Sequence, residues 1–356
     1  MLDKLLPKKV QDIEEYRPNL VPCRIRLDAN ESPFLPSKAI LDELANAVFS
    51  IDFNRYPDPY ASDLIAAFAK IYNVDPQNVV AGNGSDELIS LICSGLIEPG
   101  DTVSVVLPDF SMYEFYSSLA GANMVRFVKS ETFEVNYETL LAEVKKNGSK
   151  IVILSNPCNP TGWVAKREEV TKFIRSFEGI AVIDEAYMEF SPENESVLDL
   201  AAGCENLIVL KTMSKAFGAA ALRLGFAITN DVLASTIRKI KSPYNVNSVS
   251  QTFGKIILEH CAEIEAHIRE LKENTIYLRD QLAKIENSSI VRICPTAANF
   301  VYIKLASQEL AADVKTRLME QGIAIRCMSS GGYIRVTAGK RDEIDEFIHK
   351  FREVLS

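Results

Sequence analysis

The sequence predicts an α/β protein with a large domain built on a mainly parallel β-sheet and a second, smaller α+β domain. Apolar runs such as Val103–Leu107 and Ile180–Ile183 are continuous rather than alternating, which is typical of strands buried on both faces. Helical stretches separate these runs, as in repeated strand–helix–strand units. The length of 356 residues accommodates about two domains. We expect an N-terminal arm and part of the small domain in 1–45, the large domain in 46–248 and the small domain in 249–356.

Composition and charge argue against several classes of protein. The formal net charge of -9 disfavours a nucleic-acid-binding surface and suits a cytoplasmic protein. The seven cysteines are scattered without a C-x-x-C pair, which indicates neither a zinc site nor a disulfide framework and suits a reducing compartment. The N-terminus lacks the pattern of a signal peptide, and no apolar run reaches the roughly 18 residues of a membrane span. We therefore expect no metal, no nucleic acid and no membrane among its partners.

The chain is expected to begin with an irregular arm, in which Pro7, Pro18 and Pro22 disfavour a long helix. A polar turn follows at Leu27–Phe34, between a short strand and a helix. Asn30 in this turn is a candidate for lining a substrate pocket. A turn rich in asparagine, serine and proline, however, needs no function in order to form.

A second turn, Asn54–Tyr60, precedes an amphipathic helix. The apolar positions expected on one face of this helix are Leu64, Ala67, Phe68 and Ile71. Tyr56 lies within this turn, in the sequence Arg55–Pro57. It is either a tyrosine packed beside prolines or a residue with a functional role.

The segment Val79–Ile89 changes from a strand to a glycine turn and then to a helix. Backbone amides after Gly84, at the start of that helix, form a natural anion site through unpaired donors and the helix dipole. Ser85 and Asp86 are residues that begin helices, and capping alone explains them. Capping does not explain Gly82 and Gly84 together, so we predict a phosphate-binding turn.

Two further apolar runs end in side chains that can bind a ligand. Phe110 follows one run, and an aromatic ring there can stack on a flat cofactor ring, although core packing is an alternative. Tyr113 is a second candidate on the same segment. The other run ends in Asp184, which could also belong to a metal site of the Walker B kind. The chain contains no G-x-x-x-x-G-K-[ST] loop, which argues against that alternative.

A lysine follows the apolar run Leu207–Leu210. Lys215 lies between Ser214 and a segment rich in alanine and glycine that ends at Arg223. Open α/β sheets bind ligands outside the carboxyl ends of their strands, which is where this lysine is expected. If burial lowered its pKa, the neutral amine could form a Schiff base with a carbonyl group, and Arg223 could bind a phosphate. A solvated lysine after a core strand is the alternative.

The last part of the chain is expected to be helical over roughly 248–286 and then to alternate between strand and helix. The expected elements are strands at Phe300–Lys304, Ala324–Arg326 and Tyr333–Thr337, a helix near 307–321 and a terminal helix. Arg326 and Arg335 lie on two of these strands. They are either ordinary surface charges or anion-binding groups, since a guanidinium binds a carboxylate through two hydrogen bonds.

These motifs, in this order, resemble those of pyridoxal-phosphate aminotransferases with the aspartate aminotransferase-like fold, over nearly the whole chain. The pair Ser214–Lys215 followed by Arg223 is similar to the cofactor-lysine signature, and Asn156–Gly162 is similar to the N-P-x-N-P-T-G motif. Two segments, Leu27–Phe34 and Lys241–Asn247, resemble the histidinol-phosphate aminotransferase family in particular. Ser32 stands where that family usually has asparagine.

The resemblance implies a role for each candidate residue. Lys215 would carry pyridoxal 5'-phosphate and move the substrate proton, Asp184 would contact the pyridine nitrogen, and Phe110 would stack on the ring. Asn156 and Tyr187 would donate hydrogen bonds to the phenolic oxygen, which favours its ionised form. The expected phosphate ligands are Gly84, Ser85, Asp86, Thr212, Ser214, Arg223 and, reaching across a homodimer interface, Tyr56. Asn30, Arg326 and Arg335 would bind the substrate.

The implied reaction is a ping-pong transfer of the amino group from L-histidinol phosphate to 2-oxoglutarate in histidine biosynthesis, giving imidazole-acetol phosphate and L-glutamate. The family usually carries a tyrosine after a proline in the N-terminal arm, whereas Asn19 follows Pro18 here and Tyr16 precedes that proline. An aromatic amino-acid aminotransferase and a threonine-phosphate decarboxylase therefore stay open, because they share every cofactor residue. A PLP-binding regulator without catalysis is a further alternative, which usually carries a DNA-binding domain ahead of this fold. We expect no such domain before residue 30.

Overall fold

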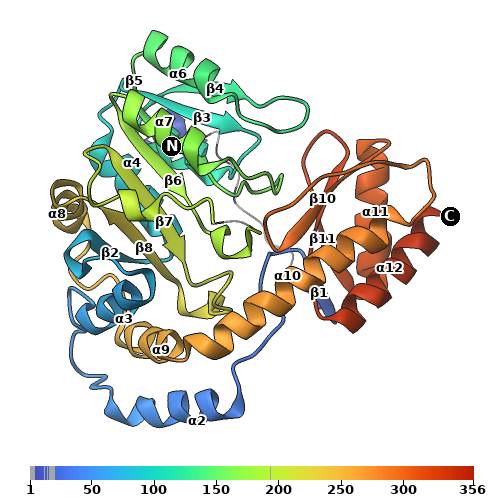
Figure 1. Ribbon diagram of the computed structural model, residues 1–356, viewed down its shortest axis with the longest axis horizontal. Coiled ribbons are helices and arrows are strands. Elements are labelled where there is room, and N and C mark those ends of the chain that lie inside the picture. Colours follow the sequence, from blue (N-terminus) through green and yellow to red (C-terminus); the bar gives the residue numbers. More distant parts are fainter. Residues whose placement is uncertain (1–4, 12, 14, 16–20, 193) are drawn as a thin grey trace.

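The computed structural model describes residues 5–11, 13, 15, 21–192 and 194–356, which form two β-sheets with their own helices (Figure 1). The seven-stranded sheet lies on the left of Figure 1 and the five-stranded sheet on the right, and the long helix α10 (Cys261–Ala283) runs between them. The predicted α/β fold with a large and a small domain is confirmed. The domain boundaries at 45 and 248 stay a prediction.

The large sheet has the strand order β2-β8-β7-β6-β5-β3-β4. The five strands from β7 to β4 in this order are parallel, whereas β8 is antiparallel to both β7 and β2. The sheet is therefore mainly parallel, as the sequence predicts. Its strands are β2 (Val79–Asn83), β3 (Thr102–Leu107), β4 (Asn123–Val128), β5 (Ser149–Ser155), β6 (Ile180–Asp184), β7 (Leu207–Thr212) and β8 (Leu224–Thr229).

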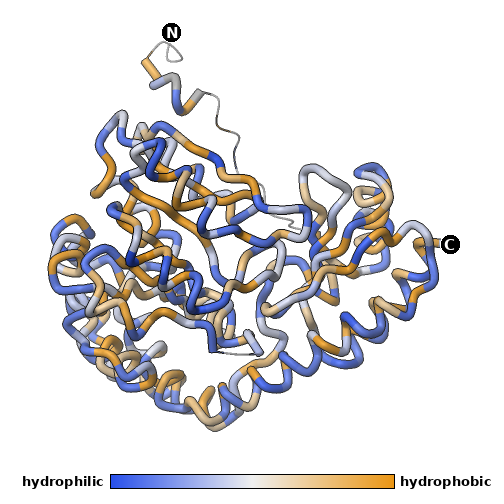
Figure 2. Tube along the Cα trace, turned by 45° about the horizontal axis from the view of Figure 1, so that its top comes forward, coloured by the Kyte–Doolittle hydropathy of each residue, from blue (hydrophilic) through white to orange (hydrophobic). Residues whose placement is uncertain are grey.

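Both faces of the large sheet are covered, which explains the continuous apolar runs. In β5, Ile151 and Ile153 pack into one hydrophobic cluster, whereas Val152 and Leu154 pack into another on the opposite face. Neighbouring residues of a strand point to opposite faces, so a strand between two cores must be apolar at every position. Figure 2 shows these strands coloured as hydrophobic along much of their length, whereas the helices carry both kinds of residue.

The helices around this sheet begin, in four cases out of the eight described, at polar residues that accept hydrogen bonds from backbone amides, such as Asn136, Asn230 and Asn247. They are α2 (Lys38–Ala47), α3 (Ser62–Tyr72), α4 (Ser85–Leu96), α5 (Met112–Leu119), α6 (Tyr137–Lys146), α7 (Arg167–Ser176), α8 (Asp231–Ile240) and α9 (Ser248–Glu259). A single turn, α1 (Lys8–Gln11), lies in the arm. Short 3-10 segments lie at Val48–Ser50, Pro76–Asn78, Met188–Phe190, Leu198–Leu200 and Ala220–Leu222.

The predicted apolar face of α3 is partly wrong. Its buried residues are Leu64, Ile65, Phe68 and Ala69, whereas Ile71 is 37% exposed. The helix packs against α9 and β2. The buried residues form two adjacent rows with a four-residue spacing, Leu64 with Phe68 and Ile65 with Ala69, and the three-residue step from Phe68 to Ile71 leads out of these rows. Which rows are buried depends on the neighbours, and the sequence of α3 does not contain that information.

The small domain has the strand order β1-β11-β12-β10-β9, with β1 parallel to β11 and the other pairs antiparallel. An N-terminal strand therefore pairs with a C-terminal strand. The strands are β1 (Ile25–Leu27), β9 (Ile290–Ile293), β10 (Phe300–Leu305), β11 (Ile323–Cys327) and β12 (Tyr333–Thr337), and the helices besides α10 are α11 (Gln308–Glu320) and α12 (Arg341–Leu355). The region expected to be helical over roughly 248–286 consists of α9 and α10, which meet at His260.

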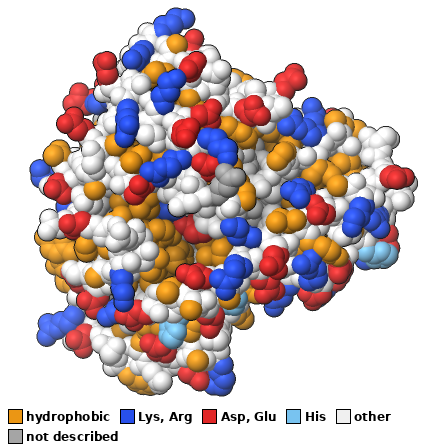
Figure 3. All heavy atoms as spheres, viewed as in Figure 1, with side chains coloured by type: hydrophobic (Ala, Val, Ile, Leu, Met, Phe, Trp, Pro, Cys, Tyr) orange, Lys and Arg blue, Asp and Glu red, His pale blue; other side chains and the backbone are white. Residues whose placement is uncertain are grey.

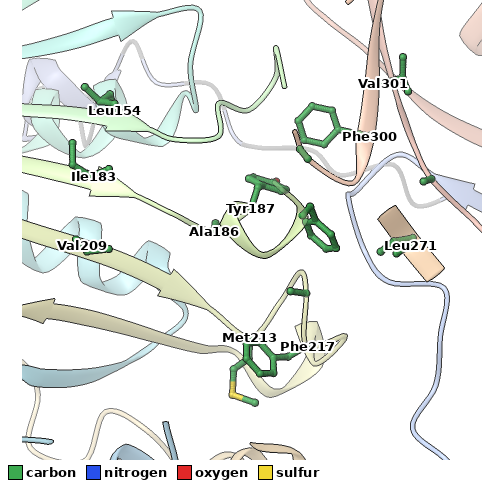
Figure 4. Packing of buried hydrophobic residues seen from close by; sticks show 14 of the residues in the cluster. Leu154, Ile183, Ala186, Tyr187, Val209, Met213, Phe217, Leu271, Phe300 and Val301 are labelled. Atoms are coloured by element: carbon green, nitrogen blue, oxygen red, sulfur yellow. The ribbon is translucent and has the colours of Figure 1, made fainter. Parts of the chain in front are cut away.

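One hydrophobic core continues from the large sheet into the small domain. Figure 4 shows Ile183 and Val209 on the strands of the large sheet, Tyr187 on the loop that follows β6, and Phe300 facing that loop from β10. The rings of Tyr187 and Phe300 meet edge to face, with centroids 5.4 Å apart. The loops at the carboxyl ends of the strands are thus enclosed between the two domains.

Candidate active site

The candidate residues gather at the carboxyl ends of three adjacent parallel strands. Ser155 at the end of β5 is the register partner of Asp184 at the end of β6, and Asp184 in turn pairs with Leu210 of β7. Asn156 therefore begins its loop beside Asp184, and Thr212 ends the next strand. This edge is where open α/β sheets bind ligands.

Lys215 lies in the loop after β7 and is half-buried. Its Nζ donates a hydrogen bond to the Ala29 carbonyl, 2.9 Å away, so the loop contacts the polar turn near the N-terminus. Burial, followed by the positive charge of Arg335, lowers the pKa of Lys215 to about 8. A sizeable fraction of the amine is then neutral and nucleophilic near neutral pH, as a Schiff-base lysine requires.

Asp184 is buried, and both of its oxygens accept hydrogen bonds. Oδ1 accepts from the Ala186 amide at 3.0 Å, and Oδ2 accepts from the Tyr113 hydroxyl at 2.9 Å. Burial raises the pKa of Asp184 to about 6. A buried carboxyl group held in this way is suited to pair with a protonated ring nitrogen, since that partner would favour its ionised form.

Tyr113 is the functional contact that sequence reasoning missed. The sequence indicated it only as a second aromatic candidate beside Phe110, whereas its fully buried hydroxyl orients Asp184. Tyr113 lies on α5 after β3, and β5 separates β3 from β6. Only the strand order brings these two residues together, and the fully buried tyrosine shows no separate signal in the sequence.

The predicted phosphate-binding turn forms a narrow cradle. Gly84 has a φ of 83° and immediately precedes α4, so the first amides of the helix point outward from Ser85. A Cβ atom on Gly84 would lie 2.8 Å from Arg223 Nη2, and a Cβ atom on Gly225 would lie 2.3 Å from the Ser85 nitrogen. Gly225 therefore needs to be glycine because two backbone segments approach closely there, whereas Gly84 needs to be glycine because of its positive φ.

Polar side chains surround the cradle. Arg223 Nη1 donates to Ser214 Oγ at 3.3 Å, and Arg223 Nη2 lies 3.6 Å from Asp86 Oδ2. Thr212 Oγ1 accepts from the Ser214 amide at 3.1 Å and fixes the start of the loop. The structure thus brings all the intrachain phosphate ligands named from the sequence to one place, where a guanidinium and a helix N-terminus favour an anion.

Asn156 is oriented toward a partner that the protein itself does not provide. Its Oδ1 accepts from the Ala165 amide at 2.8 Å, while its buried Nδ2 has no hydrogen-bond partner among the described residues. An unsatisfied buried donor costs about 1–3 kcal/mol, so a ligand oxygen there would be stabilising. Tyr187 lies on the neighbouring loop, and its hydroxyl accepts from Asn30 Nδ2 at 2.9 Å.

The three residues expected to bind substrate differ in their surroundings. Asn30 is buried and bonded to Thr337 as well as to Tyr187, so it positions the tyrosine. Arg335 donates to the Asp28 carbonyl at 2.9 Å and to Asn159. Arg326 is the register partner of Arg335 on β11, but it is exposed. The role of Arg326 stays a prediction.

Tyr56 lies on the surface of the chain. It is 80% exposed and stacks on Tyr244, with ring centroids 4.5 Å apart. Phe49, Phe53 and Tyr60 nearby in the sequence are also exposed. Figure 3 shows a patch of hydrophobic side chains over the large domain, while charged side chains of both signs lie around this patch and over the small domain. Exposed aromatic residues in such number are typical of an interaction surface.

The residues present fit pyridoxal phosphate. The amine of Lys215, with its lowered pKa, suits the aldehyde, and the buried carboxyl group of Asp184 suits the ring nitrogen. The cradle at Gly84 suits the phosphate, and the unsatisfied donor of Asn156 suits the phenolic oxygen. In the parts of the chain that the structure describes, no cluster of three or more metal-ligating side chains is found, and no helix could span a membrane. The arm residues Tyr16, Pro18 and Asn19 lie outside the described residues.

Comparison with known proteins gives consistent matches over the whole chain. The sequence matches the family model of aminotransferase class I and II over residues 24–351. A histidinol-phosphate aminotransferase from Clostridium kluyveri is 36% identical over 358 residues, with 100% of each chain covered. The structure of a histidinol-phosphate aminotransferase from Sinorhizobium meliloti in complex with pyridoxal-5'-phosphate superposes with a TM-score of 0.90 and 24% identity, covering 98% of this chain and 97% of that one.

The fold is also shared with an enzyme of another reaction type. An L-threonine-O-3-phosphate decarboxylase from Porphyromonas gingivalis superposes with a TM-score of 0.80 and 21% identity, over 93% of this chain and 99% of that one. The architecture by itself therefore does not select a substrate.

Proposed function

The chain belongs to the class I and II aminotransferase family, and on this premise we propose that it transfers the amino group of L-histidinol phosphate to 2-oxoglutarate, giving imidazole-acetol phosphate and L-glutamate. Its cofactor is pyridoxal 5'-phosphate, which when bound supplies a sink for the electrons left behind as the substrate loses its α-proton. The observation that carries the proposal is the placement of Lys215, Asp184 and the phosphate cradle at the same edge of the sheet, and the lowered pKa of Lys215 supports it.

Lys215 has two tasks in this proposal. As a neutral amine it would hold the cofactor through the aldehyde group of that cofactor. Its freed Nζ then accepts the proton from the substrate α-carbon. A pKa of about 8 suits both tasks, because the amine is easily deprotonated and still a competent base near neutral pH.

Asp184, Tyr113 and Asn156 hold the cofactor ring. Asp184 would keep a proton on the ring nitrogen, and the Tyr113 hydroxyl fixes the orientation of its carboxylate. Asn156 Nδ2 donates to the phenolic oxygen, an assignment supported by its buried and unsatisfied state. Phe110 stacks on the ring. These groups are arranged before the substrate arrives, so no reorganisation is needed during the reaction.

The choice of substrate is supported by the relatives. The curated relatives that match over the full length, such as that of Clostridium kluyveri at 36% identity, are histidinol-phosphate aminotransferases. We assign Arg335 to the anionic end of the substrates, because a guanidinium binds both carboxylate and phosphate through two parallel hydrogen bonds.

We further propose that the enzyme is a cytoplasmic homodimer in which Tyr56 binds the phosphate of the neighbouring subunit. The support is the exposure of Tyr56 together with Phe49, Phe53, Tyr60 and Tyr244. A surface of this kind is stabilised when a second copy covers it. Replacing Tyr56 by phenylalanine should weaken cofactor binding without separating the subunits.

The test is to add L-histidinol phosphate to the protein loaded with pyridoxal phosphate and to follow the visible absorbance. We expect rapid loss of the long-wavelength band and its recovery on addition of 2-oxoglutarate. Phenylalanine and tyrosine serve as comparison amino donors, and threonine phosphate tests the decarboxylase alternative. A spectrum that responds to one of these and not to histidinol phosphate would overturn the substrate assignment, and failure to load the cofactor would overturn the function itself.

A further inference from the structure

Lys129 is a buried lysine that the proposed reaction does not use. It directly follows β4, and its side chain is 2% exposed. Its ammonium group has three acceptors: the Pro108 carbonyl at 2.9 Å, Cys158 Sγ at 2.9 Å and Asp109 Oδ2 at 3.5 Å. An ammonium group has three hydrogens, so this set of partners is complete.

Asp109 is the centre of the cluster. Its side chain is 1% exposed, and besides Lys129 it accepts from the amide of Phe110 at 2.8 Å, from the amide of Ser155 at 3.2 Å and from Ser155 Oγ. One carboxylate therefore fixes the residue expected to stack on the cofactor ring. It also fixes the end of β5, which directly precedes Asn156.

The same chain of contacts continues to the substrate side. Ser155 Oγ accepts from the Asn159 amide at 3.2 Å, and Asn159 Oδ1 accepts from Arg335. The loop after β3 and the loop after β5 are thus tied to each other and to Arg335 of the small domain. Lys129 supplies the positive charge that balances the buried carboxylate of Asp109.

We propose that Lys129 is a positioning residue of the active site, which acts through Asp109 and Cys158 to set the places of Phe110, which would stack on the cofactor ring, and Asn156, which would donate to its phenolic oxygen. This inference rests on the proposed function. Lys129 itself touches neither the ring position nor the substrate position, and its effect is transmitted through hydrogen bonds of buried side chains.

The charge state of the cluster agrees with this role. Burial by itself lowers the pKa of Lys129, but Cys158 and Asp109 together outweigh burial and leave the pKa raised. Lys129 therefore stays positively charged at neutral pH. It opposes the effect of burial on Asp109, which raises the pKa of that carboxyl group. Without the lysine, Asp109 would take up a proton more readily and its contacts to Ser155 would rearrange.

The test is the variant Lys129→Met, which removes the charge and keeps a flexible side chain of similar volume. We expect its dissociation constant for pyridoxal phosphate to rise by about tenfold, because a displaced Phe110 and Asn156 lose contacts to the ring. We also expect the pH midpoint of the visible absorbance of the loaded protein to move upward, since a weaker donation from Asn156 favours the ionised phenolic oxygen less. Neither readout depends on turnover.

The matched control is Lys150→Met. Lys150 of β5 pairs with Asp101, which precedes β3, at 2.5 Å, so it links the same two strands at their opposite ends. Because that pair is partly exposed and far along the strands from the loops, we expect less than about a twofold change in cofactor affinity. A second variant, Lys129→Met with Asp109→Asn, removes both buried charges and should fold even if the single variant does not.

The outcomes separate this inference from the proposed function. If the wild-type protein binds no pyridoxal phosphate, the proposed function fails. If the wild type binds it and Lys129→Met has an affinity and a pH midpoint equal to those of Lys150→Met, Lys129 has no positioning role. If neither the single nor the double variant folds, the cluster serves general stability and the inference is equally overturned.

Discussion

Two lysines four residues apart are placed in opposite electrostatic surroundings. Lys211, near the end of β7, is buried beside Glu189 at 2.8 Å and Glu185 at 3.2 Å. Burial alone lowers its pKa, but these two carboxylates outweigh burial and leave the pKa of Lys211 raised. In the loop just beyond, burial, followed by the positive charge of Arg335, lowers the pKa of Lys215 to about 8, although the carboxylates of Glu31 and Asp86 act in the opposite direction.

The difference shows that partners, rather than burial alone, decide what a lysine does in a protein. Burial disfavours the charge of both lysines. A lysine with carboxylate partners keeps its proton and holds the structure together. A lysine among other cations gives up its proton more easily and becomes available for chemistry.

The largest expected effect separates the two lysines by activity. Lys215→Ala should lower the turnover number by about 10⁴-fold, because it removes both the cofactor-bonding amine and the base. The melting temperature of the variant should stay close to that of the wild type. The Lys215 side chain donates one hydrogen bond within the described part of the chain, to the Ala29 carbonyl, so little is lost. Steady-state kinetics and a thermal melt give the answer. A variant that retained a tenth of the activity would remove Lys215 from the mechanism.

The second-largest expected effect is on stability, which should depend on Lys211 far more than on Lys215. Lys211→Met should lower the free energy of unfolding by about 3 kcal/mol, because two carboxylates lose a buried cation. The loss is not larger because both carboxylates keep other hydrogen-bond donors. Glu185 still accepts from Ser196 and Val197, and Glu189 still accepts from the Tyr72 hydroxyl. Urea unfolding measures it, and adding Glu189→Gln should restore part of the loss. A change below about 0.5 kcal/mol would show that the pair is not stabilising.

A smaller effect concerns the pH dependence of cofactor loading. At a pKa of about 8 roughly a tenth of Lys215 is neutral at pH 7, whereas at its ordinary value of 10.5 only about one in three thousand molecules would be. The association rate of pyridoxal phosphate with the apoprotein should therefore rise with pH and level off above pH 8. Arg335→Met removes a cation that lowers this pKa, so its profile should move to higher pH. If the pH profile of the Arg335→Met variant were the same as that of the wild type, burial alone would account for the lowered pKa of Lys215.

The smallest effect is a gain in stability of the apoprotein. Lys215→Met should raise the free energy of unfolding by about 1 kcal/mol at pH 7, because the charged form of Lys215 is disfavoured in the folded state. The folded pKa of about 8 lies below the ordinary 10.5, so this penalty is complete below pH 8 and disappears as the pH rises toward 10.5. The gap between variant and wild type should therefore narrow between pH 8 and pH 10.5. A gap that widened would contradict the assignment.

The sequence by itself determined most of the fold and indicated the candidate reactive groups. Strands such as β5 and β6 are continuous apolar runs, because both faces of the sheet are covered. The glycine turn at Gly84 and the pair Ser214–Lys215 are local patterns that can be recognised from a few adjacent residues. The family match confirms the resemblance that these motifs carry.

Only the tertiary structure decided which residues act together. Nothing local sets the pKa values of Lys211 and Lys215, since the charged groups that act on them come from other segments of the chain. The hydroxyl of Tyr113 reaches Asp184 only because of the strand order, and Ile71 is exposed only because of how α3 meets its neighbours. A pattern within one segment reports what that segment can do. The pKa of a lysine or the orientation of a carboxylate is set by charges and donors that are distant in the sequence, and it therefore follows from the packing of the whole chain.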